Sequence, residues 1–490
     1  MFTKLLQLSK AKINFEFLIL LLFFTWLIAY IFLGEHILVA DGLGWDGAIY
    51  GHITQLLPDL LFSHQLDQYS LQRILPLGVV YSFAKLFHTS LEVAKMPMAF
   101  SIYNTGLLVL AVFIWHNLAK KLNWNSQVRL ISFAGLFLNY AILKMNPYYP
   151  ILTDTSGFVC GLAMFYFFLT EKNYGVLLTA ILGAFVFPTL LYIGLVLFIF
   201  PRQKNQTYFH ADKIATSLAL LLAVTVVSIC LFVHLKLHQQ ALGGYYATPV
   251  LYISAISLFA YVILAARPLS SYYSSFFSNL KHIQIQRVFF ALIIAVCLKK
   301  CIAFFSSGKT GMLSFSLFAE NITSQSLAYP LVFLVSHILY YGPIVCLLIY
   351  FWNDVVKYLT ANGFGLFLVC SLYLLLSIGS ESRQLINFLP IAVIVLAEVL
   401  NCKSLSWKFT HLFILLSLMV SRAWLPLNHG TWLSLLSNPP EITLAFPMQW
   451  YFMSQGPWMS HAMYLVNFIL VTLLLYFIYR MTKTGIANLH

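Results

Sequence analysis

The segment 35–52 carries the residue types best suited to chemistry in this chain. Three carboxylates lie among glycines there, and Asp46 stands between Trp45 and Gly47, four residues before Tyr50. A glycine-rich turn lets a substrate approach the backbone, so Asp46 could act as a general base. Alternatively, Trp45 belongs to the aromatic belt of a membrane interface and Asp46 caps the following helix. The residues alone leave both interpretations open.

A second carboxylate, Asp154, follows Thr153 just before the apolar run 156–171. Thr or Asp before such a run is typical of a helix amino-terminal cap. The amino-terminal end of a helix also favours anions, and an acid placed there could complement Asp46. Asp154 is therefore a candidate either for capping or for catalysis.

Two arginines stand where polar loops meet apolar runs. Gln72 and Arg73 precede one run, and Glu381 and Arg383 lie between two others. The planar guanidinium of arginine suits a phosphate group. The alternatives are that Arg73 extends its charge to lipid headgroups and that Arg383 pairs with Glu381 in a solvated turn.

The segment 421–462 is rich in Trp and Pro and contains Arg422 and His429. Such loops serve as lids at an interface or as plain connectors. Arg422 and His429 are further candidates for substrate binding.

These residues must be positioned by membrane helices. The chain has 490 residues, of which 61% are hydrophobic and 9% charged, whereas soluble proteins average about 25% charged. We therefore predict an all-α, polytopic integral membrane protein with about 12–14 helical segments, interfacial helices in its first outer loop, and membrane lipids as surroundings. The seven cysteines lack metal-ligand spacing, and the net charge of +13 is dispersed, which argues against nucleic acid as a partner.

Basic residues set the predicted orientation. Lys4, Lys10 and Lys12 precede the apolar run 17–34, and Arg480 and Lys483 follow the last apolar run, so both termini are expected in the cytoplasm. The segments 35–72 and 421–462 then face the extracytoplasmic side of a single membrane domain, 1–490. Between residues 73 and 143 the number of crossings stays open. A bacterial plasma membrane is the first expectation and an endoplasmic-reticulum membrane the second.

Several catalytic motifs are missing. The sequence contains no HExxH, no P-loop, no GxSxG and no DxD. Zinc hydrolysis, ATP hydrolysis and esterase chemistry therefore have no support.

The element Gly44-Trp45-Asp46-Gly47-Ala-Ile-Tyr50 is similar to the Trp-Asp-Gly-x-x-Tyr element of some GT-C mannosyltransferases, and the predicted architecture resembles that superfamily. The resemblance implies an inverting transfer of a sugar from a polyprenyl-phosphate donor to a glycan, lipid or protein acceptor. It implies Asp46 as general base, Asp154 as second acid, and Arg73 or Arg383 on the carrier phosphate. Asp46 has no adjacent acid and no large soluble domain follows, so a divalent metal and a peptide acceptor stay unassigned.

Two rival functions use the same residues. A transporter or flippase of lipid-linked glycans would bind a headgroup with them, although matched broken helices are absent and Glu398 is the main charge deep in a predicted span. A non-catalytic scaffold would tolerate alanine at Asp46 and Asp154.

Overall fold

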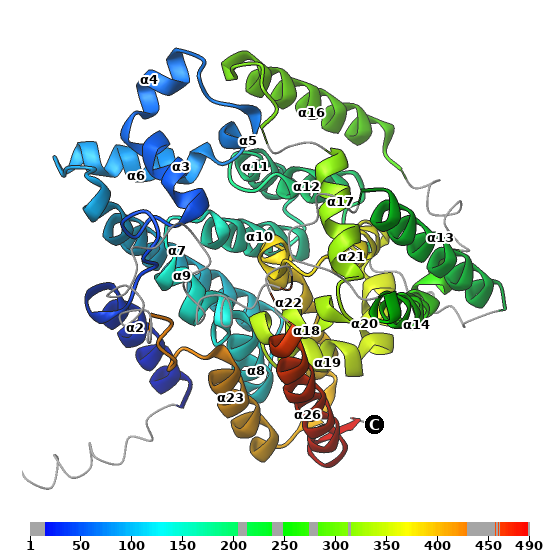
Figure 1. Cartoon of the computed structure of the whole chain (residues 1–490). Coiled ribbons are helices and arrows are strands. Elements are labelled where there is room, and N and C mark those ends of the chain that lie inside the picture. Colours follow the sequence, from blue (N-terminus) through cyan, green and yellow to red (C-terminus); the bar gives the residue numbers. More distant parts are fainter. Residues whose placement is uncertain are drawn as a thin grey trace, which may run out of the picture.

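The computed structural model describes residues 15–203, 213–237, 248–273, 283–311, 315–428, 456, 459 and 461–488. Helices make up 78% of this part, which confirms the all-α prediction (Figure 1). A single short strand pair joins β1 (Lys403–Leu405) to β2 (Ile486–Asn488).

Long apolar helices define the membrane architecture. Within the described residues six helices are long and apolar enough to span a bilayer, or up to eight if two bent pairs each count as one span. The bends are 49° between 126–137 and 141–148, and 80° between 344–350 and 352–361. The six are α2 (Phe15–Leu33), η1 with α7 (Val93–Lys95 and Met96–Lys121), α13 (Lys213–Leu237), α14 (Thr248–Tyr273), α16 (Ile285–Phe305) and α26 (His461–Gly485).

The other apolar segments are shorter than a bilayer is thick. A helix of 13 residues is about 20 Å long, whereas the hydrocarbon core is about 30 Å. The predicted 12–14 segments are thus a mixture of long and short helices. The shorter ones are α6 (Ile74–Leu86), α10 (Asp154–Leu169), α11 (Asn173–Gly183), α12 (Thr189–Ile199), α18 (Val332–Tyr341), α21 (Phe364–Leu376), α22 (Leu389–Asn401) and α23 (Trp407–Ser421).

Proline and glycine set two of the helix breaks. The apolar stretch 175–200 is divided before Pro188, because α11 ends at Gly183 and α12 starts after Pro188. The apolar run 330–351 divides at Gly342 into α18 and α19 (Ile344–Tyr350). Gly342 adopts φ +82°, a left-handed conformation that ends a helix.

Short helices fill the predicted outer loop and several connections. In segment 35–72 they are α3 (Trp45–Gln55), α4 (Leu57–Phe62) and α5 (Gln68–Leu71). Elsewhere they are α8 (Ser126–Phe137), the π-helical turn η2 (Ala141–Met145), α9 (Asn146–Tyr148), α17 (Phe315–Ser326), α20 (Trp352–Ala361) and η3 (Ser382–Leu385).

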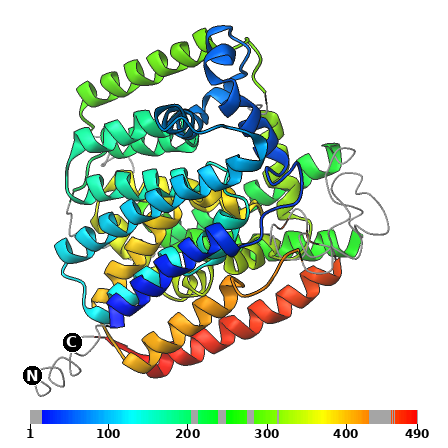
Figure 2. The same cartoon turned by 90° about the vertical axis from the view of Figure 1, so that its left-hand side faces the viewer.

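The start of the first described helix, α2, and the end of the last one, α26, lie at the same end of the bundle. The ring of Phe15, where α2 begins, lies 5.1 Å from that of His411 near the start of α23. Strand β2, which follows α26, pairs antiparallel with β1, which precedes α23. In Figure 2 the start of α2 and the end of α26 lie at the same end. Since α2 has 19 residues, Glu35 lies about 28 Å away, at the opposite end.

Aromatic packing between α2, α7 and α8 forms part of the core. The ring of Phe133 lies 5.2 Å from Trp115, 4.9 Å from Phe137 and 5.6 Å from Phe23. Helix α16 differs from this core, because only two of its residues, Ala291 and Ile302, are buried. Extensive exposed apolar faces of this kind require lipid. The chain is therefore a multi-pass integral membrane protein.

Candidate functional site

The first loop lies directly against the segment that leads to Asp154. A Cβ atom at Gly44, where φ is +72°, would lie only 2.4 Å from Cζ of Tyr149. The amide of Gly47 donates to the Tyr149 hydroxyl over 2.9 Å. Glycine at these two positions therefore permits the close contact on which the site is built.

Asp46 is the second residue of α3, and its carboxylate does not cap that helix. The cap residue is Gly44, without a side-chain hydrogen bond. Oδ2 of Asp46 instead accepts a hydrogen bond from Nη2 of Arg383 at 2.7 Å, across 337 residues of chain. The capping interpretation is thus wrong for Asp46.

Arg383 is shared between two carboxylates. Its Nε donates to Oε1 of Glu381 over 2.7 Å, and Nε2 of Gln384 donates to the other oxygen of Glu381 over 2.6 Å. The predicted pairing of Glu381 with Arg383 is therefore present. It uses Nε of Arg383, and Nη2 binds Asp46 instead. The Arg383 side chain is 21% exposed and that of Asp46 is 29% exposed, so both are reachable from solvent.

Helix α10 and the turn η3 are held together by a close backbone approach. A Cβ atom on Gly161 would lie 2.0 Å from the carbonyl oxygen of Asn387. The side-chain nitrogen Nδ2 of Asn387 donates to the hydroxyls of Tyr373 at 2.8 Å and Thr189 at 2.7 Å. Tyr341 donates to the Ser382 carbonyl. These contacts fix the turn that carries Glu381 and Arg383 against the helix that begins with Asp154.

Asp154 has a buried carboxylate oxygen without a partner. Its Oδ2 is sealed from solvent and accepts no hydrogen bond from the residues that the structure describes, and the cap residue Thr153 makes no side-chain cap either. A cavity of about 10 Å³ lies beside Asp154, lined partly by Asn146, Tyr149 and Tyr340. Such a volume holds about one water molecule. Burial raises the pKa of Asp154 to about 6, while the nearby charge of Arg383 opposes that rise.

The pKa of Asp46 moves in the opposite direction. Burial alone would raise it, but the charge of Arg383 and its hydrogen bond together hold the pKa of Asp46 below its usual value. Arg73 contributes to the same lowering. The two acids therefore differ in proton affinity although the same charges act on both.

Arg73 lies at the edge of this cluster, where α6 begins. Its guanidinium stacks 3.7 Å from the ring centre of Tyr69 and donates to the Tyr69 carbonyl at 3.3 Å. Gln72 is the residue before it, at the end of α5. Tyr50 is buried close enough for the charges of Arg73 and Asp46 to act on it, whereas Trp45 is 37% exposed.

Arg422 does not join the cluster in the described structure. The Arg422 guanidinium stacks 4.3 Å from the centre of the Tyr140 ring and donates to the Leu339 carbonyl over 3.0 Å, so its contacts hold the turn after α23. His429 lies outside the described residues, as does most of segment 421–462. In the part of the chain that is described, no three His, Cys, Asp or Glu side chains gather as metal ligands.

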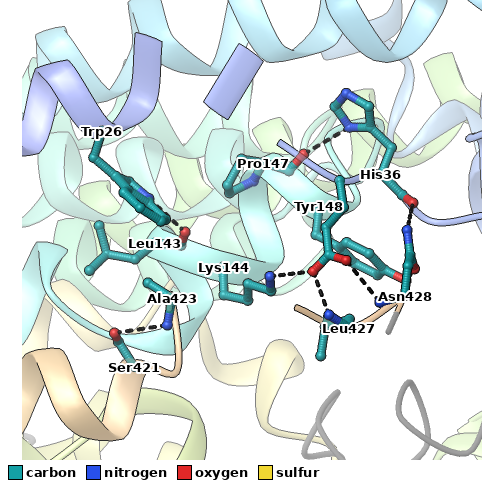
Figure 3. Close-up of polar contacts among 11 residues, drawn as sticks. Trp26, His36, Leu143, Lys144, Pro147, Tyr148, Ser421, Ala423, Leu427 and Asn428 are labelled. Atoms are coloured by element: carbon teal, nitrogen blue, oxygen red, sulfur yellow. Dashed lines mark hydrogen bonds and ion pairs between the residues drawn. The ribbon is translucent and has the colours of Figure 1, made fainter. Parts of the chain in front are cut away.

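The sequence analysis missed a second charged cluster, which we call the Glu35 node: Glu35, Lys144, Leu427 and Asn428. Oε1 of Glu35 accepts from Nζ of Lys144 and the amide of Leu427, each at 2.5 Å, and Oε2 accepts from the amide of Asn428 at 2.8 Å. Lys144 is only 2% exposed, and Figure 3 shows it pointing toward this junction. The sequence feature that could have predicted this cluster is Lys144, a charged residue placed against an apolar run.

Comparisons with protein-family models, with curated proteins and with solved structures found no match for this chain.

Proposed function

We propose that the protein is a membrane glycosyltransferase of the GT-C type, which transfers a sugar from a polyprenyl-phosphate donor to an acceptor hydroxyl at the extracytoplasmic face. The observation that carries this proposal is the pairing of Asp46 with Arg383, beside Asp154 and Arg73. A proton acceptor and two guanidiniums in one partly open site match the two demands of sugar transfer. One group must take a proton, and others must hold a phosphate.

The proposed step is a single displacement with inversion. The acceptor oxygen attacks the anomeric carbon while its proton passes to the carboxylate of Asp46. The bond from that carbon to the phosphate oxygen breaks, and the electron pair leaves with the polyprenyl phosphate, which gains one negative charge. Arg383 and Arg73 are the cations available to stabilise that charge.

Arg383 links the two halves of this reaction. In the structure its Nη2 is held by Asp46, which keeps the pKa of Asp46 low and makes this carboxylate a weak base. A donor phosphate that takes over Arg383 would remove that interaction, and the pKa of Asp46 would rise toward a value suited to proton abstraction. Binding of the donor would thus activate the base.

The test is a transfer assay with the purified, full-length protein in detergent and a panel of radiolabelled polyprenyl-phosphate sugars. We expect wild type to release polyprenyl phosphate and Asp46→Asn to lower the rate by about 10²- to 10⁴-fold, because an amide cannot take the proton. The matched control, Asp59→Asn, changes an exposed acid on α4 and should keep full activity.

Wild-type turnover by a folded Asp46→Asn protein would overturn the proposal. The assay also separates the rival transporter, because transport requires two compartments and bond cleavage does not. Full biological function of variants with alanine at both Asp46 and Asp154 would instead favour a scaffold.

A further inference from the structure

A second cleft, of about 490 Å³, opens beside the first part of the first loop. The loop after α2 and the start of α7 form its walls, and it shares no lining residue with the small cavity at Asp154. Its volume lies within the range of small-molecule sites, about 300–1,000 Å³. The apolar lining includes Leu38, Pro97 and Met98, and the polar lining is His36, Asp41 and Asn428.

The polar groups of this cleft are not equally available to a ligand. The Asn428 side chain is occupied, since its Nδ2 donates to the His36 carbonyl and its Oδ1 accepts from the Tyr148 hydroxyl, both at 2.9 Å. Asn428 therefore helps to shape the wall but has little hydrogen-bonding capacity left.

His36 presents a hydrogen-bond acceptor. Its Nδ1 lies 3.2 Å from the Pro147 carbonyl, which can only accept, so Nδ1 carries the proton. Burial lowers the pKa of His36, which keeps the ring neutral near pH 7 and leaves Nε2 with a free lone pair. Figure 3 shows this second ring nitrogen pointing away from Pro147.

Asp41 presents a second acceptor. Its exposed carboxylate forms no hydrogen bond or ion pair within the described part of the chain. Its backbone φ is +54°, next to +51° at Ala40, a left-handed conformation that residues other than glycine adopt uncommonly. The amide of Gly44 donates to the Val39 carbonyl at 2.8 Å and closes the turn that holds Asp41 in place.

We propose that this cleft binds a carbohydrate, whose hydroxyls donate to Asp41 and His36 while its apolar face packs on Pro97 and Met98. The two side-chain acceptors, Asp41 and His36, favour ligands that carry hydrogen-bond donors, and the Asp41 charge repels phosphate. The same loop continues through Gly44 to Asp46, so we assign the cleft to the sugar acceptor. This assignment to the acceptor rests on the proposed function, whereas carbohydrate binding itself does not.

The experiment is saturation-transfer NMR on the full-length protein in detergent micelles, with the methyl glycosides of mannose, glucose, galactose and N-acetylglucosamine as probes. At least one glycoside should receive saturation. Asp41→Asn should weaken its binding by about tenfold or more, because a charge-assisted hydrogen bond is lost. Met98→Trp should fill the cleft and abolish binding. The control Phe113→Trp, at an exposed site on the same helix, should bind as wild type does.

The cleft assignment fails if no glycoside binds wild type, or if Met98→Trp or Asp41→Asn binds as well as wild type. The outcomes differ from those that test the transferase. Glycoside binding that depends on Asp41, in a protein that cleaves no polyprenyl-phosphate sugar, keeps the cleft and removes the proposed function. Donor cleavage that depends on Asp46, without glycoside binding, does the reverse.

Discussion

The Glu35 node and the Asp46 cluster, which comprises Asp46, Arg73, Asp154, Glu381 and Arg383, both join the first loop to distant helices. They differ in how completely their charged groups are paired. In the Glu35 node both carboxylate oxygens accept hydrogen bonds, and Lys144 is 2% exposed. In the Asp46 cluster the ion pair with Arg383 stays partly open, and Asp154 keeps a buried oxygen without a partner among the described residues. A closed ion pair stabilises a fold, whereas an incomplete one is available for a ligand.

Breaking the Glu35 node should have the largest effect on stability. Lys144→Met leaves Glu35 partly buried without its counterion, and loss of one partner of a buried pair costs about 3–5 kcal/mol. Thermal unfolding in detergent would show a large drop in Tm. The exposed Lys121→Met is the control. A Tm equal to wild type for Lys144→Met would show that the node is not structural.

Removal of Arg383 should affect turnover more than folding. Arg383→Gln removes a cation from the leaving phosphate, and one such donor is worth about 10²- to 10³-fold in rate. The acid limb of the pH–rate profile should also move to higher pH, because the pKa of Asp46 loses its main lowering interaction. An unchanged acid limb with a slower rate would argue against Asp46 as the base. Lys85→Gln, at an exposed position on α6, is the control.

Asp154→Asn should stabilise the protein at neutral pH. The folded pKa of Asp154, about 6, lies above its unfolded value, so the folded state binds more protons between about pH 4 and 6 and stability from this group falls as pH rises through that window. The amide avoids that loss and should add about 1–3 kcal/mol near pH 7. Tm measured against pH should show the gain at about pH 7.5 and none at about pH 4. An equal gain at both would contradict the assignment.

The smallest effect is expected at an exposed ion pair. Lys95 and Glu92 are 3.3 Å apart with side chains that are 62% and 65% exposed. Water and salt screen such exposed pairs, so Lys95→Ala should leave Tm nearly unchanged. A Tm shift as large as that of Lys144→Met would mean that burial does not explain the difference between the two clusters.

Sequence patterns identified individual residues of the site better than the contacts between them. Asp154 and Arg383 were recognisable because each borders an apolar run, and Asp46 because it lies in a glycine-rich turn beside Trp45. Their partners were not recognisable, because the contact between Arg383 and Asp46 spans 337 residues and no local periodicity encodes it. The same reason explains why the Glu35 node was missed.

Local sequence signals also predicted the positions of helices more reliably than the number of membrane crossings. The apolar runs predicted the helices, and Pro188 marked a real break. The number of crossings depends on tilt, length and neighbours, which composition does not determine. The pairing of β1 with β2 could not be predicted either, because strands of three residues carry too little pattern to recognise.

The π-helical turn η2 contains one residue more than an α-helical turn would. Each residue advances a helix by about 100°, so the chain after this turn faces a different direction than an uninterrupted α-helix would give it. Tyr149, which receives the first loop, and Asp154 both follow the turn. The gain or loss of a single codon within 141–145 would therefore be enough to assemble or dismantle this junction during evolution, without exchange of any side chain that forms it.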